Sequence, residues 1–222
     1  MSSAQTAKRM LAVEGYSDKR FFLGLQRHIN FAIPFEVKFP GDQNRHPGKV
    51  GAIKSFNVWL QEAAEPGRYE SIGVAVDADF VSNGGFLSTD RELKAKLAEA
   101  DFHMIDSSRR IYKHKISGCL ASYWIAPSHS SDGYLESLIL KSLKTSEVAY
   151  LTSDVRPYCA GLVEPRFETK NSDRAMLYVF LAIQRKPDKS LPTLLDDGMI
   201  DLGSPDIAAL KEWLVNLFGI AE

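Results

Sequence analysis

Acidic side chains follow two short apolar runs of the sequence, where a buried charge is costly without a partner. Glu14 ends the run MLAVEG, and Asp77 and Asp79 lie near the end of SIGVAVDADF. Because strand side chains alternate, Asp77 and Asp79 are expected on the same side of the chain. Close carboxylates repel one another, and burial increases that repulsion. Oxygen ligands of this kind suit a hard divalent cation, so the three residues together predict a metal site.

Each motif is weak evidence when it is taken alone. A single glutamate at the end of a strand is more often solvated or engaged in capping a helix, and an isolated DxD pattern usually has no metal role. The prediction therefore depends on both motifs following predicted core strands. In an open α/β sheet, the carboxyl ends of parallel strands are where ligands bind.

Short apolar runs alternate along the chain with longer segments of helical periodicity. Strands are expected at 9–15, 34–41, 71–80 and 122–127, and helices at 17–29, 49–65, 88–100, 133–143, 172–186 and 204–218. Ser17 is expected to cap the first helix, which places Asp18 in its first turn. The Pro- and Asp-rich segment 187–205 is interpreted as a connection.

This order of elements predicts the fold class. Strands that alternate with helices favour an α/β fold with a doubly wound, mostly parallel sheet. We expect this domain to span residues 1–150. A helical C-terminal extension is expected over residues 151–222, packed on the same core.

Composition sets broad limits on the class of protein. The chain has 222 residues, 45% of them hydrophobic, which is enough for one sizeable core. Its formal net charge of -1 does not by itself indicate nucleic-acid binding. Cys119 and Cys159 form no CxxC pattern or disulfide framework. The first ten residues lack the apolar region of a signal peptide, and no stretch is long enough to span a bilayer. We therefore expect a cytoplasmic protein without membrane contact.

The two acidic motifs resemble those of the TOPRIM family. AVEGYSDKRFF followed by VAVDADF is similar to the family's Glu after the first strand and its later D-x-D after a central strand. The family includes topoisomerases, bacterial-type primases, small RNA-maturation nucleases and OLD-family nucleases. The resemblance covers residues 10–145 and is strongest to small standalone TOPRIM proteins and to the TOPRIM half of OLD nucleases. It implies a Rossmann-like TOPRIM domain.

The resemblance also implies roles for the acidic residues. Asp77 and Asp79 match the carboxylates that bind Mg²⁺ or Mn²⁺, and Glu14 matches a residue that holds metal or transfers a proton. Asp18 matches a position that holds a second metal in the nuclease branch, although it is equally interpretable as a first-turn helix residue. Glu136, in GYLE, matches a Gly-x-x-Glu of related standalone proteins or is a solvated helix glutamate.

Basic residues on three segments are candidates for contacting phosphate. The loop after the second predicted strand is rich in Gly and Pro, and the segment SSRRIYKHKIS is either a nucleic-acid patch or a solvated edge strand or loop. In OLD-type nucleases a basic residue of the C-terminal part assists, for which the counterpart is Lys170 or Arg174. The candidates for binding phosphate or nucleic acid are Arg45, Lys49, Arg109, Arg110, Lys113 and Arg174.

The resemblance implies a divalent-metal-dependent nuclease that hydrolyses phosphodiesters of DNA or RNA. The chain has no GxxxxGK[ST] motif, so an ATPase of ABC type would be a separate partner in a defence or repair system. The alternative is a non-catalytic partner subunit that binds metal or nucleotide. A homodimer is left open.

A haloacid-dehalogenase-like phosphatase is the less favoured alternative. DADFV matches the D-x-D-x-V pattern of that family, which places its nucleophilic Asp on the first strand. Here the motif follows two predicted strand–helix units, and Glu14 would have no role.

Overall fold

A six-stranded sheet forms the centre of the computed structural model, which describes residues 8–29, 31, 34–43, 47–187 and 190–219. The strand order is β2-β1-β3-β6-β5-β4; the first four strands in this order are parallel, and β5 is antiparallel to both of its neighbours, β6 and β4. The strands are β1 (Lys8–Val13), β2 (Glu36–Lys38), β3 (Tyr69–Asp77), β4 (Phe102–Asp106), β5 (Ile111–His114) and β6 (Leu120–Ala126). The expected α/β fold with a mostly parallel sheet is confirmed.

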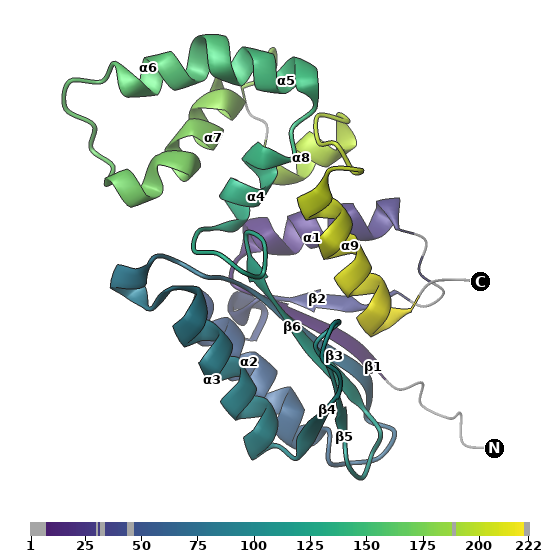
Figure 1. Cartoon of the computed structure of the whole chain (residues 1–222). Helices are drawn as coiled ribbons and strands as arrows, with labels where there is room; N and C mark the ends of the chain where they lie inside the picture. Colours follow the sequence, from purple (N-terminus) through teal and green to yellow (C-terminus); the bar gives the residue numbers. More distant parts are fainter. Residues whose placement is uncertain (1–7, 30, 32–33, 44–46, 188–189, 220–222) are drawn as a thin grey trace.

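Helices cover both faces of the sheet (Figure 1). They are α1 (Tyr16–His28), α2 (Lys49–Glu62), α3 (Gly85–Glu99), α4 (Leu135–Lys141), α5 (Thr145–Tyr150), α6 (Arg156–Ala160), α7 (Ser172–Ala182), α8 (Leu191–Asp196) and α9 (Pro205–Phe218). Short 3₁₀ or π turns lie at η1 (Pro40–Gln43), η2 (Val81–Asn83), η3 (Leu151–Val155) and η4 (Thr169–Asn171). Helices α5, α6 and α7 form a layer at the end of the molecule farthest from β4 and β5 (Figure 1).

The alternation of side chains along the strands divides the core in two. On β1, Met10 and Ala12 pack with α2 and α3, whereas Leu11 and Val13 pack with α1, α4 and the C-terminal helices. Apolar residues that point to both faces are typical of strands in a covered parallel sheet. The helices from α7 onward share the second of these clusters with the sheet and α1.

Three local predictions need correction. Helix α1 begins at Tyr16 after Gly15, so Ser17 lies inside its first turn and does not cap it. The segment interpreted as a connection contains α8, where Ser190 and Thr193 form a capping box before two apolar turns. The basic segment SSRRIYKHKIS includes β5, which is not the edge strand expected as one alternative, because it pairs with both β4 and β6. Among the described residues, no helix combines the length and the apolar character needed to cross a membrane.

Candidate functional site

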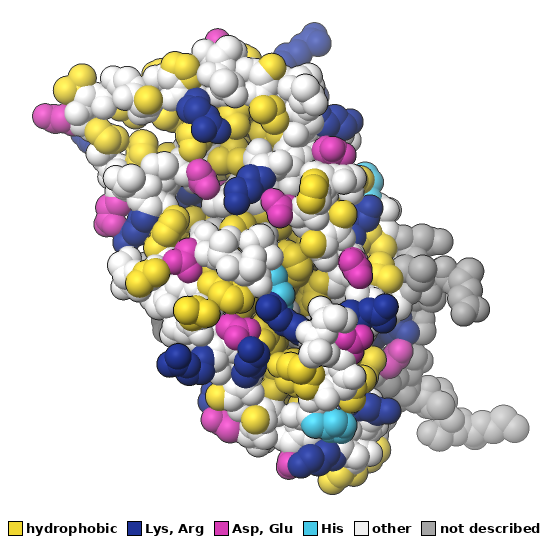
Figure 2. All heavy atoms as spheres, viewed as in Figure 1, with side chains coloured by type: hydrophobic (Ala, Val, Ile, Leu, Met, Phe, Trp, Pro, Cys, Tyr) yellow, Lys and Arg dark blue, Asp and Glu magenta, His cyan; other side chains and the backbone are white. Residues whose placement is uncertain are grey.

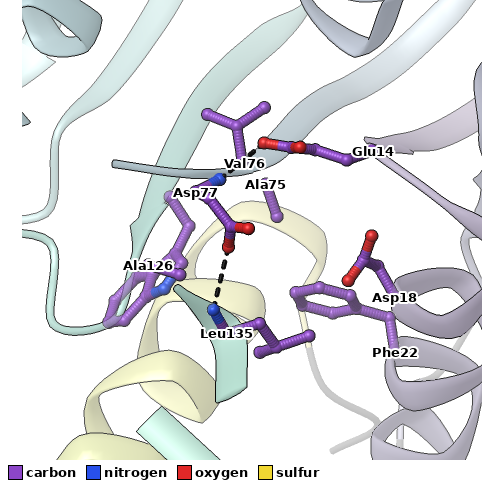
Figure 3. A pocket seen from close by; sticks show the side chains of 9 residues that line it. Glu14, Asp18, Phe22, Ala75, Val76, Asp77, Ala126 and Leu135 are labelled. Carbon is purple, nitrogen blue, oxygen red and sulfur yellow. Dashed lines mark hydrogen bonds between the residues drawn. The ribbon is translucent and has the colours of Figure 1, made fainter. Parts of the chain in front are cut away.

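Glu14 and Asp77 meet at the carboxyl ends of two neighbouring parallel strands. Glu14 follows β1, Asp77 ends β3, and the register pairs Val13 with Ala75. The Glu14 Oε1 atom accepts a hydrogen bond of 2.7 Å from the Asp77 backbone N–H. Asp77 Oδ1 in turn accepts one of 2.8 Å from the N–H of Leu135 at the start of α4 (Figure 3). The two carboxylates are therefore held in place by backbone groups of other elements.

Asp18 joins them from the first turn of α1. Its Oδ2 atom accepts a hydrogen bond of 2.8 Å from the Gly15 N–H, which satisfies a donor at the helix N-terminus. Glu14, Asp18 and Asp77 line one cavity, with Phe22 among the residues that close it (Figure 3). The cavity has a volume of about 10 Å³, close to the space that one water molecule needs.

The carboxylates that line the cavity repel one another, because like charges lie close together in a buried space. Burial, with repulsion from Asp18 and Asp79, raises the pKa of Glu14 to about 7, although the Asp77 N–H and Lys49 oppose that rise. Burial and repulsion from Glu136 raise the pKa of Asp18 to about 6. Burial and the neighbouring carboxylates raise the pKa of Asp77 as well. Such a cluster favours uptake of a proton or a cation.

Asp79 pairs with a lysine and is not among the residues that line the cavity. The strand ends at Asp77, and Asp79 has a φ of 61°, so the expected alternation that would place both side chains together does not hold. Lys49 Nζ lies 3.0 Å from Asp79 Oδ2 and donates to the Ala78 carbonyl. Gly48 brings Lys49 there: its φ of 97° suits glycine, and its N–H donates to the Glu14 carbonyl.

Glu136 is buried near the same carboxylates and is neutralised by Arg174. The Arg174 Nε atom of α7 lies 3.0 Å from Glu136 Oε1, and its Nη2 atom lies 3.3 Å from Oε2 and 3.4 Å from Asp77 Oδ2. The guanidinium also lies 4.3 Å from the centre of the Tyr134 ring. A residue 97 positions from Asp77 in the chain thus supplies a positive charge to the cluster.

The side-chain types fit a hard divalent cation, but the arrangement is closed. Among the residues that the structure describes, no three Asp, Glu, His or Cys side chains form a group that could hold a metal ion. Backbone donors hold one oxygen each of Glu14 and Asp77, while the Lys49 and Arg174 cations neutralise Asp79 and Glu136. Loading an ion between these carboxylates therefore requires side chains to rotate and the two cations to withdraw.

A family model matches residues 8–219. This chain belongs to DUF3226, a family described as protein of unknown function. The match includes Glu14 and Asp77 as well as Arg174, so the DUF3226 unit comprises both the sheet and the C-terminal helices. The comparisons with curated proteins and with solved structures found no match.

The remaining basic candidates of this DUF3226 chain lie in different places. Arg45 lies outside the described residues. Arg109 and Arg110 line a second cavity, separate from the carboxylates, whereas Lys113 on β5 is exposed and is not part of its lining. Lys170 pairs with Glu168 at 2.8 Å, so Arg174 is the C-terminal cation that reaches the acidic cluster.

Two aromatic residues of the region were not selected from the sequence. Tyr134 lies under Arg174, and its hydroxyl donates to Asn171 just before α7. Trp124 on β6 lines both the carboxylate cavity and the cavity of Arg109 and Arg110. No sequence motif marks either residue, because aromatic residues in a strand or before a helix are common in any hydrophobic core.

Proposed function

We propose that this chain is a divalent-metal-dependent phosphodiesterase of TOPRIM type that acts on DNA or RNA, with Mg²⁺ or Mn²⁺ as its cofactor. The observation that carries the proposal is the convergence of Glu14, Asp18 and Asp77 on one small cavity at the carboxyl ends of β1 and β3. The raised pKa values of these carboxyl groups support it. Perturbed carboxyl groups in a cleft are typical of catalytic and metal sites.

Asp77, Glu14 and Asp79 are the residues that would hold the cation, with Asp18 and Glu136 as further oxygen ligands. A bound divalent ion would polarise the phosphodiester and lower the pKa of an attacking water molecule. Lys49 and Arg174, released from Asp79 and Glu136, would each be able to contact a phosphate oxygen. Lys49 and Arg174 would therefore first neutralise the acidic cluster and then position the substrate.

Glu14 is the residue suited to handling a proton. Its pKa of about 7 lies close to neutral pH, where a general acid or base works best. Oε1 is fixed by the Asp77 N–H, so Oε2 is the atom that would take up or release the proton. In this proposal Glu14 accepts a proton from the attacking water when it is not itself a ligand.

The alternative is a partner subunit that binds metal or nucleotide without cleaving, and works beside a separate ATPase. The closed arrangement favours it, because the cavity of about 10 Å³ has space for about one water molecule and two cations pair with the neighbouring Asp79 and Glu136. A partner that pulls Arg174 away would then be needed to open the site.

Calorimetric titration with Mg²⁺ and Mn²⁺, alongside incubation with supercoiled plasmid and structured RNA, tests the proposal. We expect Asp77→Asn combined with Asp79→Asn to weaken metal binding at least about tenfold and cleavage about a hundredfold. The matched control is Glu65→Gln combined with Glu99→Gln, two exposed carboxylates in surface pairs, which should change neither.

The possible outcomes separate the two functions. Metal binding that depends on Asp77 and Asp79, without cleavage of any nucleic acid, would support the partner subunit over the nuclease. A wild-type chain that binds neither ion would contradict the nuclease and the metal-binding form of the partner subunit, and would leave only a partner subunit that binds nucleotide.

A further inference from the structure

A second cavity lies beside the carboxylate cavity, with Trp124 in the wall of both. It has a volume of about 320 Å³, which is within the range of small-ligand sites. The turn between β4 and β5, the loop after β6, and α9 enclose it. Its polar and charged lining residues include Ser108, Arg109, Arg110, Ser128, Glu212 and Asn216.

Arg110 is held rigidly at this cavity. Its Nη1 atom donates to the His129 carbonyl at 3.1 Å, and its own carbonyl accepts a hydrogen bond of 2.9 Å from Ser122 Oγ. Trp213 Nε1 of α9 donates to the same Ser122 hydroxyl at 2.8 Å. The bonds through Ser122 connect α9, β6 and the turn and fix the Arg110 backbone, while the His129 carbonyl and the Phe86 ring, 5.9 Å away, position its guanidinium before any ligand arrives.

Two residues that line the same cavity have the left-handed backbone conformation that non-glycine residues rarely adopt. Among the described residues, the non-glycine residues with positive φ are Asp79, Asp101, Arg110 and His129. Two of these, Arg110 with a φ of 52° and His129 with a φ of 60°, line the cavity. Such conformations cost free energy and persist where surrounding contacts enforce them, which is common at ligand sites.

Three aromatic rings form one wall of the cavity. The His129 ring stacks on Trp124 with 5.2 Å between centroids and an interplanar angle of 11°. Its Nδ1 atom accepts a hydrogen bond of 2.9 Å from the Ile125 N–H, which fixes the ring. Trp213 lies 5.9 Å from Trp124 on the α9 side. The lining therefore combines flat aromatic groups with hydrogen-bond donors.

The charges of the lining select the chemistry of a ligand. Arg109 and Arg110 contribute two cations, and Ser108 and Ser128 contribute hydroxyl groups that suit the oxygens of a phosphate. Ser108 and Arg109 both contact the Asp106 carboxylate, at 2.7 and 3.7 Å, which a phosphate would replace. Glu212 is an acceptor that suits a sugar hydroxyl, and Asn216 offers both a donor and an acceptor. A bare anion would leave most of the volume and the aromatic wall without contacts.

We propose that this second cavity binds a nucleoside phosphate, with the phosphate at Arg109 and Arg110 and the nucleoside against the aromatic wall. The ligand is either a free mononucleotide or the terminal nucleotide of a strand. The strand-end source rests on the proposed function, because the shared Trp124 places the cavity beside the carboxylates. Binding of a mononucleotide stands independently of any hydrolysis.

Calorimetry and tryptophan fluorescence with adenosine 5′-monophosphate, in EDTA, test this site without any metal. Two of the three tryptophans of the chain, Trp124 and Trp213, line the cavity, so binding should change the fluorescence. We expect Arg109→Gln to weaken binding about tenfold, because a charge-assisted bond to phosphate is lost. Arg185→Gln removes the same charge from an exposed position outside the lining and should leave affinity unchanged.

Two further probes complete the test. Inorganic phosphate should bind at least about tenfold more weakly than the nucleotide, since it lacks the nucleoside contacts. Competition by a 5′-phosphorylated oligonucleotide, but not by its unphosphorylated form, would identify a strand end as the source; competition by neither would identify a free nucleotide.

Three results would overturn the proposal. The first is no binding of the nucleotide by the wild-type chain at millimolar concentration. The second is an equal loss of affinity in Arg109→Gln and Arg185→Gln, and the third is equal affinity for inorganic phosphate and the nucleotide. Because EDTA is present throughout, a failure of the carboxylates to bind metal affects none of these results.

Discussion

At the scale of residues, the acidic cluster is held together against its own repulsion. Glu14 and Asp77 each accept a backbone N–H, and Arg174 and Lys49 supply two positive charges. These contacts are fewer than the charges require, because the pKa values of Glu14, Asp18 and Asp77 are all raised. The cluster therefore costs stability at neutral pH, which is a common property of functional sites.

The cost should be visible in the pH dependence of unfolding. The folded chain binds a proton at Glu14 up to a pKa of about 7, against 4.5 as the ordinary value, so stability falls as pH rises through this window. In EDTA at pH 8, Glu14→Gln should raise the free energy of unfolding by on the order of 3 kcal/mol. The melting temperature should then rise by several degrees.

At pH 5 the same substitution should have little effect, because Glu14 is already protonated in the folded chain. Differential scanning calorimetry at both pH values measures this difference. A destabilised variant at pH 8 would show that the negative charge of Glu14 is compensated in the folded chain.

Arg174 should compete with a divalent cation for the carboxylates. Without metal, Arg174→Gln leaves Glu136 buried and unpaired and should cost about 1–3 kcal/mol of stability. With the guanidinium gone, Mg²⁺ affinity measured by calorimetry should rise several-fold. Arg185→Gln removes an equal charge from an exposed position just after α7 and serves as the control. Unchanged or weaker Mg²⁺ binding in Arg174→Gln would contradict the competition.

At the scale of elements, α9 lies directly on the central strand β3. A Cβ atom at Gly73 would lie 2.9 Å from Leu217 Cδ2, 3.2 Å from Leu11 Cδ1 and 3.3 Å from Phe218. The glycine is therefore required by close approach of the helix. Because β3 ends at Asp77, this packing also fixes the position of Asp77 relative to α9.

Gly73→Ala should overpack this contact and destabilise the chain by roughly 1–3 kcal/mol, measured by urea unfolding. Leu217→Ala removes the nearest atoms of the contact. The double variant should then cost less than the sum of the two single variants, since the added methyl group occupies the space left by the leucine. Additive costs would mean that the two positions are not in contact.

At the scale of the whole molecule, charges of both signs are mixed over the face shown in Figure 2 and nearly balance over the chain. Figure 2 shows Lys and Arg interspersed with Asp and Glu on one face, and the chain carries a net charge of -1. Such a surface provides no broad positive field for a polyanion. Contact with nucleic acid would instead be confined to a few cations near the two cavities.

Nucleic-acid binding, where it occurs, should therefore depend weakly on salt. A plot of the logarithm of the binding constant against that of salt concentration should have a slope of about -3 or shallower, the value for few phosphate contacts. Fluorescence anisotropy with a labelled duplex across a series of salt concentrations measures it. A slope of about -6 or steeper, typical of an extended basic interface, would contradict this.

The sequence by itself determined the four parallel strands and the acidic residues at their ends, but not β4 and β5. Apolar runs ended by Glu14 and Asp77 predict two core strands with carboxylates at their ends, and the alternation of elements makes those strands parallel. These features are local, because strand burial and helix periodicity repeat within a few residues. The expected ends of α1 and the missed α8 show where local patterns are weakest, since caps differ by single residues.

The tertiary structure alone decided which cations meet these carboxylates and which residues form the second cavity. Arg174 reaches Asp77 across 97 residues, and Arg110 is fixed by His129 and by Ser122 from two sides. The left-handed backbone of Asp79 likewise separates two aspartates that the sequence pattern places together. Such contacts depend on how distant elements pack, and no local period in the sequence records that packing.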